Sequence, residues 1–225
     1  MTTDLAKPVP ELAVPETTHG DAMPEEELLI DLLMPVADAR LAVSTVVDAP
    51  PLRAYQEAVE LDFLSVHTPL LDAAMFARGV PDRIAAALGR RTEPAVPGRL
   101  SLADGFTVEG LQGWMKLGER PGREIAFGAV GRFWTPTIVW APADPEAFAS
   151  AADPGWGKIG CAFVVQPYGE RGAILTYDCR TWVPDEESRR RFLRYWTVIR
   201  PFVGHIMKAT IGTIAGAASA AGPLD

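Results

Sequence analysis

The longest stretch of the chain with one hydrophobic period lies near its carboxyl end, from Pro184 to Ala215. At about 100° per residue, one helix face would carry the side chains of Phe192, Trp196, Ile199, Val203, Ile206, Thr210 and Ile214. This spacing predicts a long amphipathic helix. Asp185 is suited to cap its first turn. Pro201 lies inside the pattern and predicts a bend rather than an end, because the apolar period continues beyond it.

Alternation of apolar and polar positions, which is typical of strands, occupies Ala39–Asp48 and much of the region from 112 to 183. In that region we expect strands at 112–117, 124–133, 137–140, 157–166 and 173–183. Helices that begin at prolines are expected after Pro50, at 69–79, at 81–88 and after Asp144. The chain therefore predicts a strand, several helices, a run of antiparallel strands and one long helix near its end.

The last two strands flank the turn PYGERG and predict a hairpin. With the hairpin centred near Glu170, the facing pairs are Val165 and Leu175, Phe163 and Tyr177, and Cys161 and Cys179. Odd positions are then apolar and form an inner face, which the preceding strand extends with Ile125, Phe127 and Phe133. Even positions form an outer side with Lys158, Gln166, Asp178 and Arg180, and with Glu124 and Arg132 of the preceding strand.

This order of elements resembles that of the START-like or Bet v 1-like superfamily (SRPBCC), which includes polyketide cyclases and lipid-transfer proteins. Three segments carry the resemblance: LLMPVADARLAVSTVVDAPP, REIAFGAVGRFWTPTIVW and YDCRTWVPDEESRRRFLRYWTVIRPF. It covers about residues 28 to 215 and contains no catalytic signature, so it implies a fold rather than a reaction. The implied fold is the α+β helix-grip fold, a curved antiparallel sheet wrapped around a long C-terminal helix with an apolar cavity between them.

One domain is expected from residue 28 to 217, between a disordered Pro- and acid-rich tail at 1–27 and a flexible tail at 218–225. The segment 78–113 is longer than the implied fold requires, and we expect it to form a lid or side wall. The segment LLIDLLMP, residues 28–35, is strongly apolar. It either packs on the domain as a short helical lead-in or docks to a protein partner.

Composition narrows the classes of protein. The chain is 48% hydrophobic and 22% charged, and no apolar run approaches the roughly 18 residues of a membrane helix, so we expect a soluble protein without integral membrane association. The first residues lack the features of a signal peptide, which predicts a cytoplasmic location. A net charge of −8 argues against nucleic acid as a partner. Two cysteines and three scattered histidines indicate neither a metal site nor a disulfide scaffold, and no cofactor motif is present.

The odd positions of the strands and the apolar face of the long helix together predict which side chains line the implied cavity. The sheet would contribute Leu41, Val43, Phe127, Phe133, Ile159, Cys161, Phe163, Leu175, Tyr177 and Cys179, and the helix Phe192, Trp196, Ile199, Val203 and Ile206. An apolar cleft with few polar groups is typical of sites for apolar small molecules. The same side chains would also suit a packed core without a cavity, and both interpretations stay open at this point.

Three functions follow from these patterns. The first is binding of an apolar small molecule of the lipid, polyketide or terpenoid type. The second is a polyketide cyclase or dehydratase, with the Tyr177 hydroxyl as the candidate catalytic group, although a core tyrosine bonded to the backbone is the structural alternative. The third is a protein-interaction module that acts through LLIDLLMP. Cys161 and Cys179 are interpreted as small buried hydrophobes rather than a redox pair.

Overall fold

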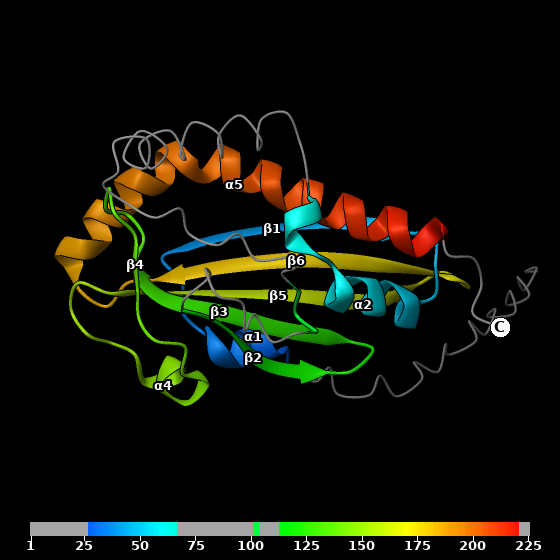
Figure 1. The fold of residues 1–225 in the computed structure, drawn as a ribbon, viewed down its shortest axis with the longest axis horizontal. Helices are drawn as coiled ribbons and strands as arrows, with labels where there is room; N and C mark the ends of the chain where they lie inside the picture. The colour runs from blue at the N-terminus through cyan, green and yellow to red at the C-terminus, as the bar shows by residue number, and fades with distance from the viewer. Residues whose placement is uncertain (1–26, 67–100, 104–112, 221–225) are drawn as a thin grey trace, which may run out of the picture.

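A computed structural model describes residues 27–66, 101–103 and 113–220. Its centre is a six-stranded antiparallel sheet in the order β1-β6-β5-β3-β2, with β4 paired to β3 (Figure 1). The strands are β1 (Ala39–Val47), β2 (Trp114–Arg120), β3 (Glu124–Arg132), β4 (Val139–Trp140), β5 (Gly157–Tyr168) and β6 (Gly172–Trp182). The helices are α1 (Leu29–Leu33), α2 (Pro51–Glu60), η1 (Phe63–Ser65), α4 (Pro145–Ser150) and α5 (Glu186–Ala220).

The register of the β5–β6 hairpin is the predicted one. Cys161 pairs with Cys179, Phe163 with Tyr177 and Val165 with Leu175. The pairing closes at Tyr168 and Gly172, and Gly169 in the turn takes a positive φ of 63°, which a residue without Cβ adopts without strain. The odd positions of both strands therefore share the inner face of the sheet, as the alternation indicated.

The long helix α5 begins where Asp185 was expected to cap it. One carboxylate oxygen of Asp185 accepts from the backbone N–H of Ser188 at 2.9 Å, and the other accepts from that of Gly155 at 2.7 Å. Pro201 does not end the helix, and α5 arches over the sheet with its convex side outward (Figure 1). The alanine-rich segment continues the helix to Ala220, three residues beyond the expected end of the domain at residue 217.

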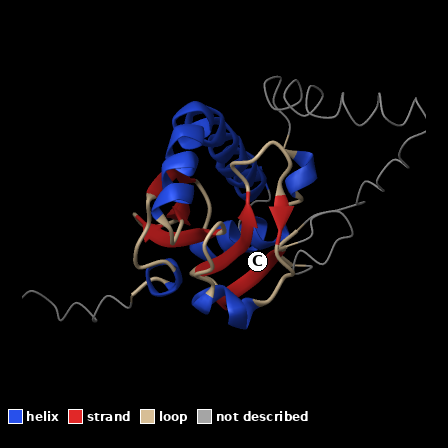
Figure 2. Ribbon diagram, turned by 90° about the vertical axis from the view of Figure 1, so that its left-hand side faces the viewer, coloured by secondary structure: helices blue, strands red, loops and turns tan. Residues whose placement is uncertain are grey.

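Helices cover both faces of the sheet (Figure 2). On the inner face, α2 and α5 pack against the odd positions of β5 and β6, whereas the outer face is covered by α1 and α4. Ile30 of α1 and Met34, which directly follows this helix, lie against Ala162 and Val164, which are even positions of β5. The approach is close: a Cβ atom on Gly160 would lie 2.6 Å from Cγ of Met34. The segment LLIDLLMP is therefore a lead-in that packs on its own domain.

The charged residues predicted for the outer side include buried and exposed ones: Glu124, Lys158, Asp178 and Arg180 are buried, whereas Arg132 is exposed. Glu124 has no exposed surface; its carboxylate accepts from the backbone N–H of Leu29 at 2.9 Å and pairs with Arg120 at 2.7 Å. Arg180 pairs with Asp31 of α1 at 2.6 Å. It also pairs with Asp178 of its own strand at 3.0 Å, so Glu124, Asp178 and Arg180 each have a partner of opposite sign.

Several expectations fall on parts of the chain outside the described residues. These are the helices at 69–79 and 81–88, nearly all of the lid or side wall at 78–113, and the tails at 1–26 and 221–225. The interaction-module hypothesis lies within the described part. It required the apolar face of LLIDLLMP to be free, and Ile30 and Met34 are buried against the sheet.

Shortening Ile30 to alanine tests whether α1 is part of the folded domain. Because Ile30 is fully buried, Ile30→Ala should lower the free energy of unfolding by about 2–4 kcal/mol in urea denaturation. Leu32 in the same helix is 54% exposed, and Leu32→Ala should change the free energy of unfolding by about 0.5 kcal/mol or less. Equal effects of the two substitutions would show that α1 does not pack as described.

Candidate functional site

At both of its ends, α5 packs against the sheet through buried side chains. We call these two regions the closed ends. At the start of the helix, Phe192 is buried with Phe133, and Trp134 and Trp140 pack against them. Phe192 meets Phe133 edge to face, with ring centroids 5.8 Å apart. Towards the other end, buried side chains from α5, α2 and the sheet form one cluster that includes Ile211, Ile214, Ala218, Ala54, Val47 and Leu175. The helix is therefore anchored at its two ends.

Between these ends the facing side chains are only half-buried. They are Leu41, Val43, Ile159, Tyr177 and Cys179 from the sheet, and Trp196, Ile199, Val203 and Ile206 from α5. Tyr177, Cys179 and Ile159 lie on β5 and β6, which are interior strands, so their accessible surface lies on the inner face rather than at a sheet edge. Ile159 packs against both closed ends and marks the span between them. This middle region is the candidate site.

The other predicted lining residues are also on the inner side but are fully packed. Phe127, Phe163, Cys161 and Leu175 belong to the large cluster under α2 and the end of α5, and Phe133 and Phe192 to the cluster at its start. The structure thus brings together the complete predicted set on one face of the sheet. Some members of the set are packed at the closed ends, and the others form the half-buried middle region. Their role as ligand contacts stays a prediction.

Tyr177 is the polar side chain at the centre of this region. Its ring lies 4.6 Å from that of Phe163 and 6.1 Å from that of Phe127. Burial raises the pKa of the Tyr177 phenol well above its usual range, and the neighbouring Cys161 and Cys179 add to the shift. Its hydroxyl hydrogen-bonds with the side chain of Cys161, whereas the core-tyrosine alternative has a backbone group as the partner. The phenol is therefore a neutral hydrogen-bond donor at physiological pH.

The two cysteines lie side by side on the same face. Both are free thiols. The hydrogen bond with Cys179 and burial hold the pKa of the Cys161 thiol well above its usual range. Because the thiolate is the reactive form, such a thiol is a poor nucleophile. This supports their interpretation as small hydrophobic side chains of the inner face.

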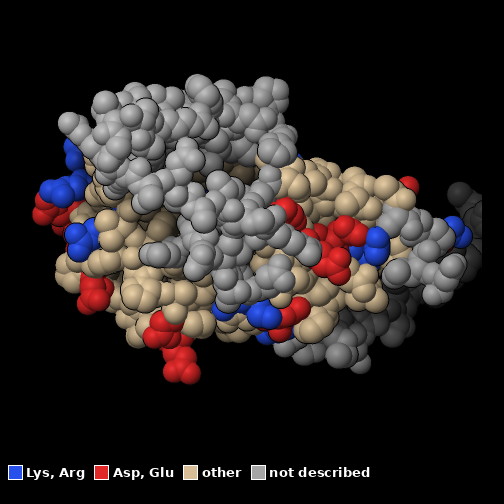
Figure 3. Space-filling model, viewed as in Figure 1, with Lys and Arg blue, Asp and Glu red and all other residues tan. Residues whose placement is uncertain are grey.

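Among residues 27–66, 101–103 and 113–220, no group of three or more His, Cys, Asp or Glu side chains is placed to hold a metal ion. No described helix is long and apolar enough to cross a membrane. Charged side chains of both signs are interspersed on the face seen in Figure 3, so no field of one sign marks a docking surface there.

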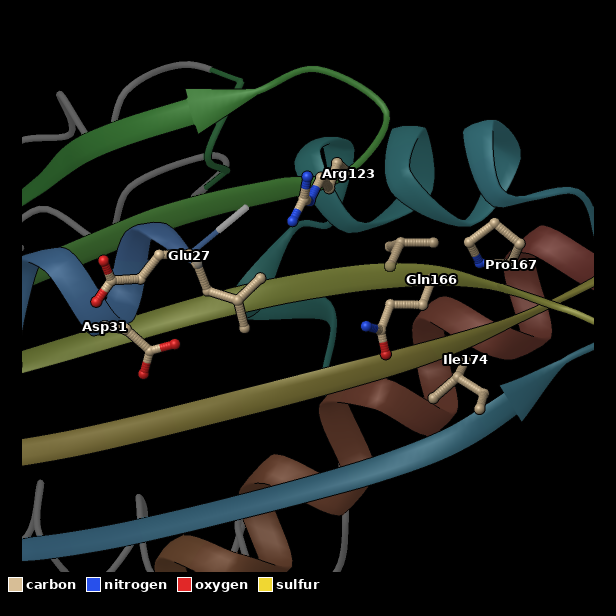
Figure 4. A pocket seen from close by; sticks show the side chains of 8 residues that line it. Glu27, Asp31, Arg123, Gln166, Pro167 and Ile174 are labelled. Atoms are coloured by element: carbon tan, nitrogen blue, oxygen red, sulfur yellow. The ribbon is translucent and has the colours of Figure 1, made fainter. Parts of the chain in front are cut away.

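A wide hollow of about 890 Å³ lies on the outer face beside α1. Its labelled side chains are Glu27 and Asp31 from α1 and its approach, Arg123 from the turn before β3, and Gln166, Pro167 and Ile174 from β5 and β6 (Figure 4). Sequence reasoning missed it, because it exists only once α1 is docked. The spacing of Ile30 and Met34, one helical turn apart, was the available signal. Charges of both signs line the hollow, so it differs from the apolar inner face.

No protein-family model and no curated protein matches the chain. Norcoclaurine synthase from Thalictrum flavum is 9% identical in a solved structure, covering 81% of this chain and 85% of that one, with a TM-score of 0.36. A protein from Mesorhizobium loti is 15% identical, covers 82% of this chain and 99% of its own, and gives a TM-score of 0.35. A protein from Arthrobacter aurescens is 12% identical, covers 80% of this chain and 86% of its own, and gives a TM-score of 0.37. At these identities and scores, the helix-grip fold rests on the topology and the packing of α5 described above, which have the predicted form.

The raised pKa of Tyr177 predicts a loss of stability in alkali. Above pH 10 the unfolded chain ionises this phenol and the folded protein does not, so its contribution to stability is complete below about pH 10 and falls as the pH rises. Tyr177→Phe should remove a slope of about 1.4 kcal/mol per pH unit from the free energy of unfolding in that range. Urea denaturation at a series of pH values measures this slope, and identical slopes for both proteins would contradict the assignment.

Proposed function

We propose that the protein binds an apolar small molecule of the lipid, polyketide or terpenoid type between the middle of α5 and the inner face of the sheet. The observation that carries this proposal is the half-buried middle region between two closed ends. Side chains such as Ile199 and Val203 of α5 are apolar, belong to the apolar stripe of the helix, and keep accessible surface. Apolar surface inside a fold, surrounded by packed residues, is what an apolar ligand covers with a gain in free energy.

The expected strength of binding follows from area. A ligand that removes about 300 Å² of apolar surface from water gains about 7 kcal/mol, before the cost of association reduces it. The Tyr177 hydroxyl would orient a ligand oxygen in otherwise apolar surroundings, by exchanging its contact with the weakly accepting thiol of Cys161 for a hydrogen bond to the ligand. The proposed ligand is therefore mostly hydrocarbon and carries at least one carbonyl or hydroxyl group.

Filling the middle region with a larger side chain tests this proposal. Val203 is half-buried on the side of α5 that faces the sheet, whereas Val198 of the same helix is 78% exposed. With the fluorophore N-phenylnaphthylamine as an apolar probe, Val203→Phe should weaken binding about tenfold or more, because the added ring occupies the probe's volume. Val198→Phe is the matched control and should leave the affinity unchanged.

The affinities are measured by fluorescence titration, with thermal melting to confirm that both variants are folded. Equal binding by wild type, Val203→Phe and Val198→Phe would place the probe elsewhere on the protein. Absence of saturable binding to the wild type would also contradict the proposal.

A second candidate function is that of a cyclase or dehydratase for a polyketide-like substrate. The observation that favours it is the neutral Tyr177 phenol inside an apolar region, where a donor to a substrate carbonyl would stabilise negative charge on oxygen during ring closure. The neighbouring Cys161 thiol is held protonated and would not compete as a nucleophile.

This candidate makes a prediction that separates it from simple binding. If the phenol acts in catalysis, Tyr177→Phe should lower the turnover of a poly-β-ketone substrate by about 10²-fold or more, while the affinity for N-phenylnaphthylamine changes by less than about twofold. Turnover is followed by the absorbance of the cyclised product. A variant that keeps full turnover excludes the catalytic role and leaves the binding function intact.

A further inference from the structure

A separate pocket of about 420 Å³ lies on the outer side of the sheet, where α4 and the loop after it cover β3 and the start of β5. Its volume is within the range of small-molecule sites. The lining is largely aromatic and aliphatic and includes Val130, Trp140, Ala147, Phe148, Trp156 and Lys158. The sheet separates this pocket from the half-buried middle region at α5, and none of the residues of that region lines the pocket; Trp140 lines the pocket and also packs at the Phe133 and Phe192 end of α5.

Lys158 is the buried charge of this pocket. The residue is 9% exposed, and its Nζ donates to the carbonyl oxygen of Ala149 at 3.2 Å. The same nitrogen lies 4.8 Å from the ring centroid of Trp182 and 5.5 Å from that of Phe148. Burial lowers the pKa of the Lys158 ammonium, and no carboxylate offsets that effect. Of its three N–H donors, one has an acceptor within the described chain.

A buried ammonium normally pairs with a carboxylate, because the loss of hydration is otherwise uncompensated. The hydrogen bond to Ala149 explains how Lys158 holds α4 but leaves two donors unused. Two aspartates also line the pocket. The carboxylate of Asp144 caps α4 by accepting from the backbone N–H groups of Glu146 and Ala147, and Asp153 is exposed. Neither forms an ion pair with Lys158, so the counter-ion position is open to a ligand.

We propose that this pocket binds a small organic anion, whose carboxylate pairs with Lys158 and whose apolar body lies against Trp140, Trp156 and Phe148. A cationic ligand is disfavoured by the buried ammonium itself. A second positive group stands nearby, since the guanidinium carbon of Arg132 lies 4.6 Å from the ring centroid of Trp156. The carboxylate of an aromatic or branched monocarboxylate would accept hydrogen bonds from the unused N–H groups of Lys158, and its apolar part would pack against the aromatic side chains.

A pair of matched probes tests the charge requirement. In fluorine NMR titrations, para-fluorobenzoate should bind the wild-type protein about tenfold or more tightly than para-fluorobenzamide, which has the same ring and no charge. Lys158→Met should remove this preference by weakening benzoate binding about tenfold or more and leaving benzamide binding nearly unchanged. Lys208→Met removes an exposed lysine of α5 and should affect neither probe.

Ala147→Phe tests the location without changing the charge. Ala147 lines the pocket, and a phenyl ring there should abolish the binding of both probes while Lys158 stays in place. This variant also carries the test if Lys158→Met fails to fold. Equal affinity of the wild type for the two probes, no binding of benzoate, or full benzoate binding by Ala147→Phe would each overturn the proposal. None of these outcomes concerns Val203 or the site under α5, so the two proposals fail independently.

Discussion

The packing of α5 at its two ends is the constraint on which the centre of the domain depends. Phe192 is buried at one end and Ile214 at the other, so both ends are held against the sheet. Between them, Pro201 removes a helical hydrogen bond and clashes with the preceding turn, which bends the helix. In its middle, the arched helix crosses beside β1, where a Cβ atom on Gly204 would lie 3.5 Å from Cδ2 of Leu41. The half-buried side chains, Tyr177 and Val203 among them, belong to this middle part of the helix and to the inner face of the sheet.

Half-buried side chains contribute fewer packing contacts than those of a filled core. The outer layer, by contrast, is well packed. There Ile30, Met34 and Phe148 pack on the opposite face of the sheet, and α1 is held by the hydrogen bond from Leu29 to Glu124 and by the ion pair between Asp31 and Arg180. A sheet that is supported on both faces keeps its shape without a completely filled inner side. The binding function proposed for one face thus depends physically on the packing of the other.

The sequence predicted the parts of this fold that depend on local patterns. The hairpin register followed from the turn and the alternation of β5 and β6, and the cap at Asp185 from one residue type at a helix start. The burial of the outer face was not predictable in this way. Polar even positions are typical of a solvent-facing side, and the pair between Arg180 and Asp31 joins residues 149 positions apart. Periodicity likewise cannot separate side chains that line a gap from those that fill it, because both follow the same repeat.

A crystal structure of the protein soaked with bromonaphthalene tests the central claim most directly. The account predicts an anomalous bromine peak between Tyr177 and Val203, with the naphthalene rings against the inner face of the sheet and the Phe192 and Ile214 ends of α5 closed as described. A structure in which Ile199 and Val203 pack directly on Ile159 and Tyr177, with no bromine peak beneath α5, would contradict it.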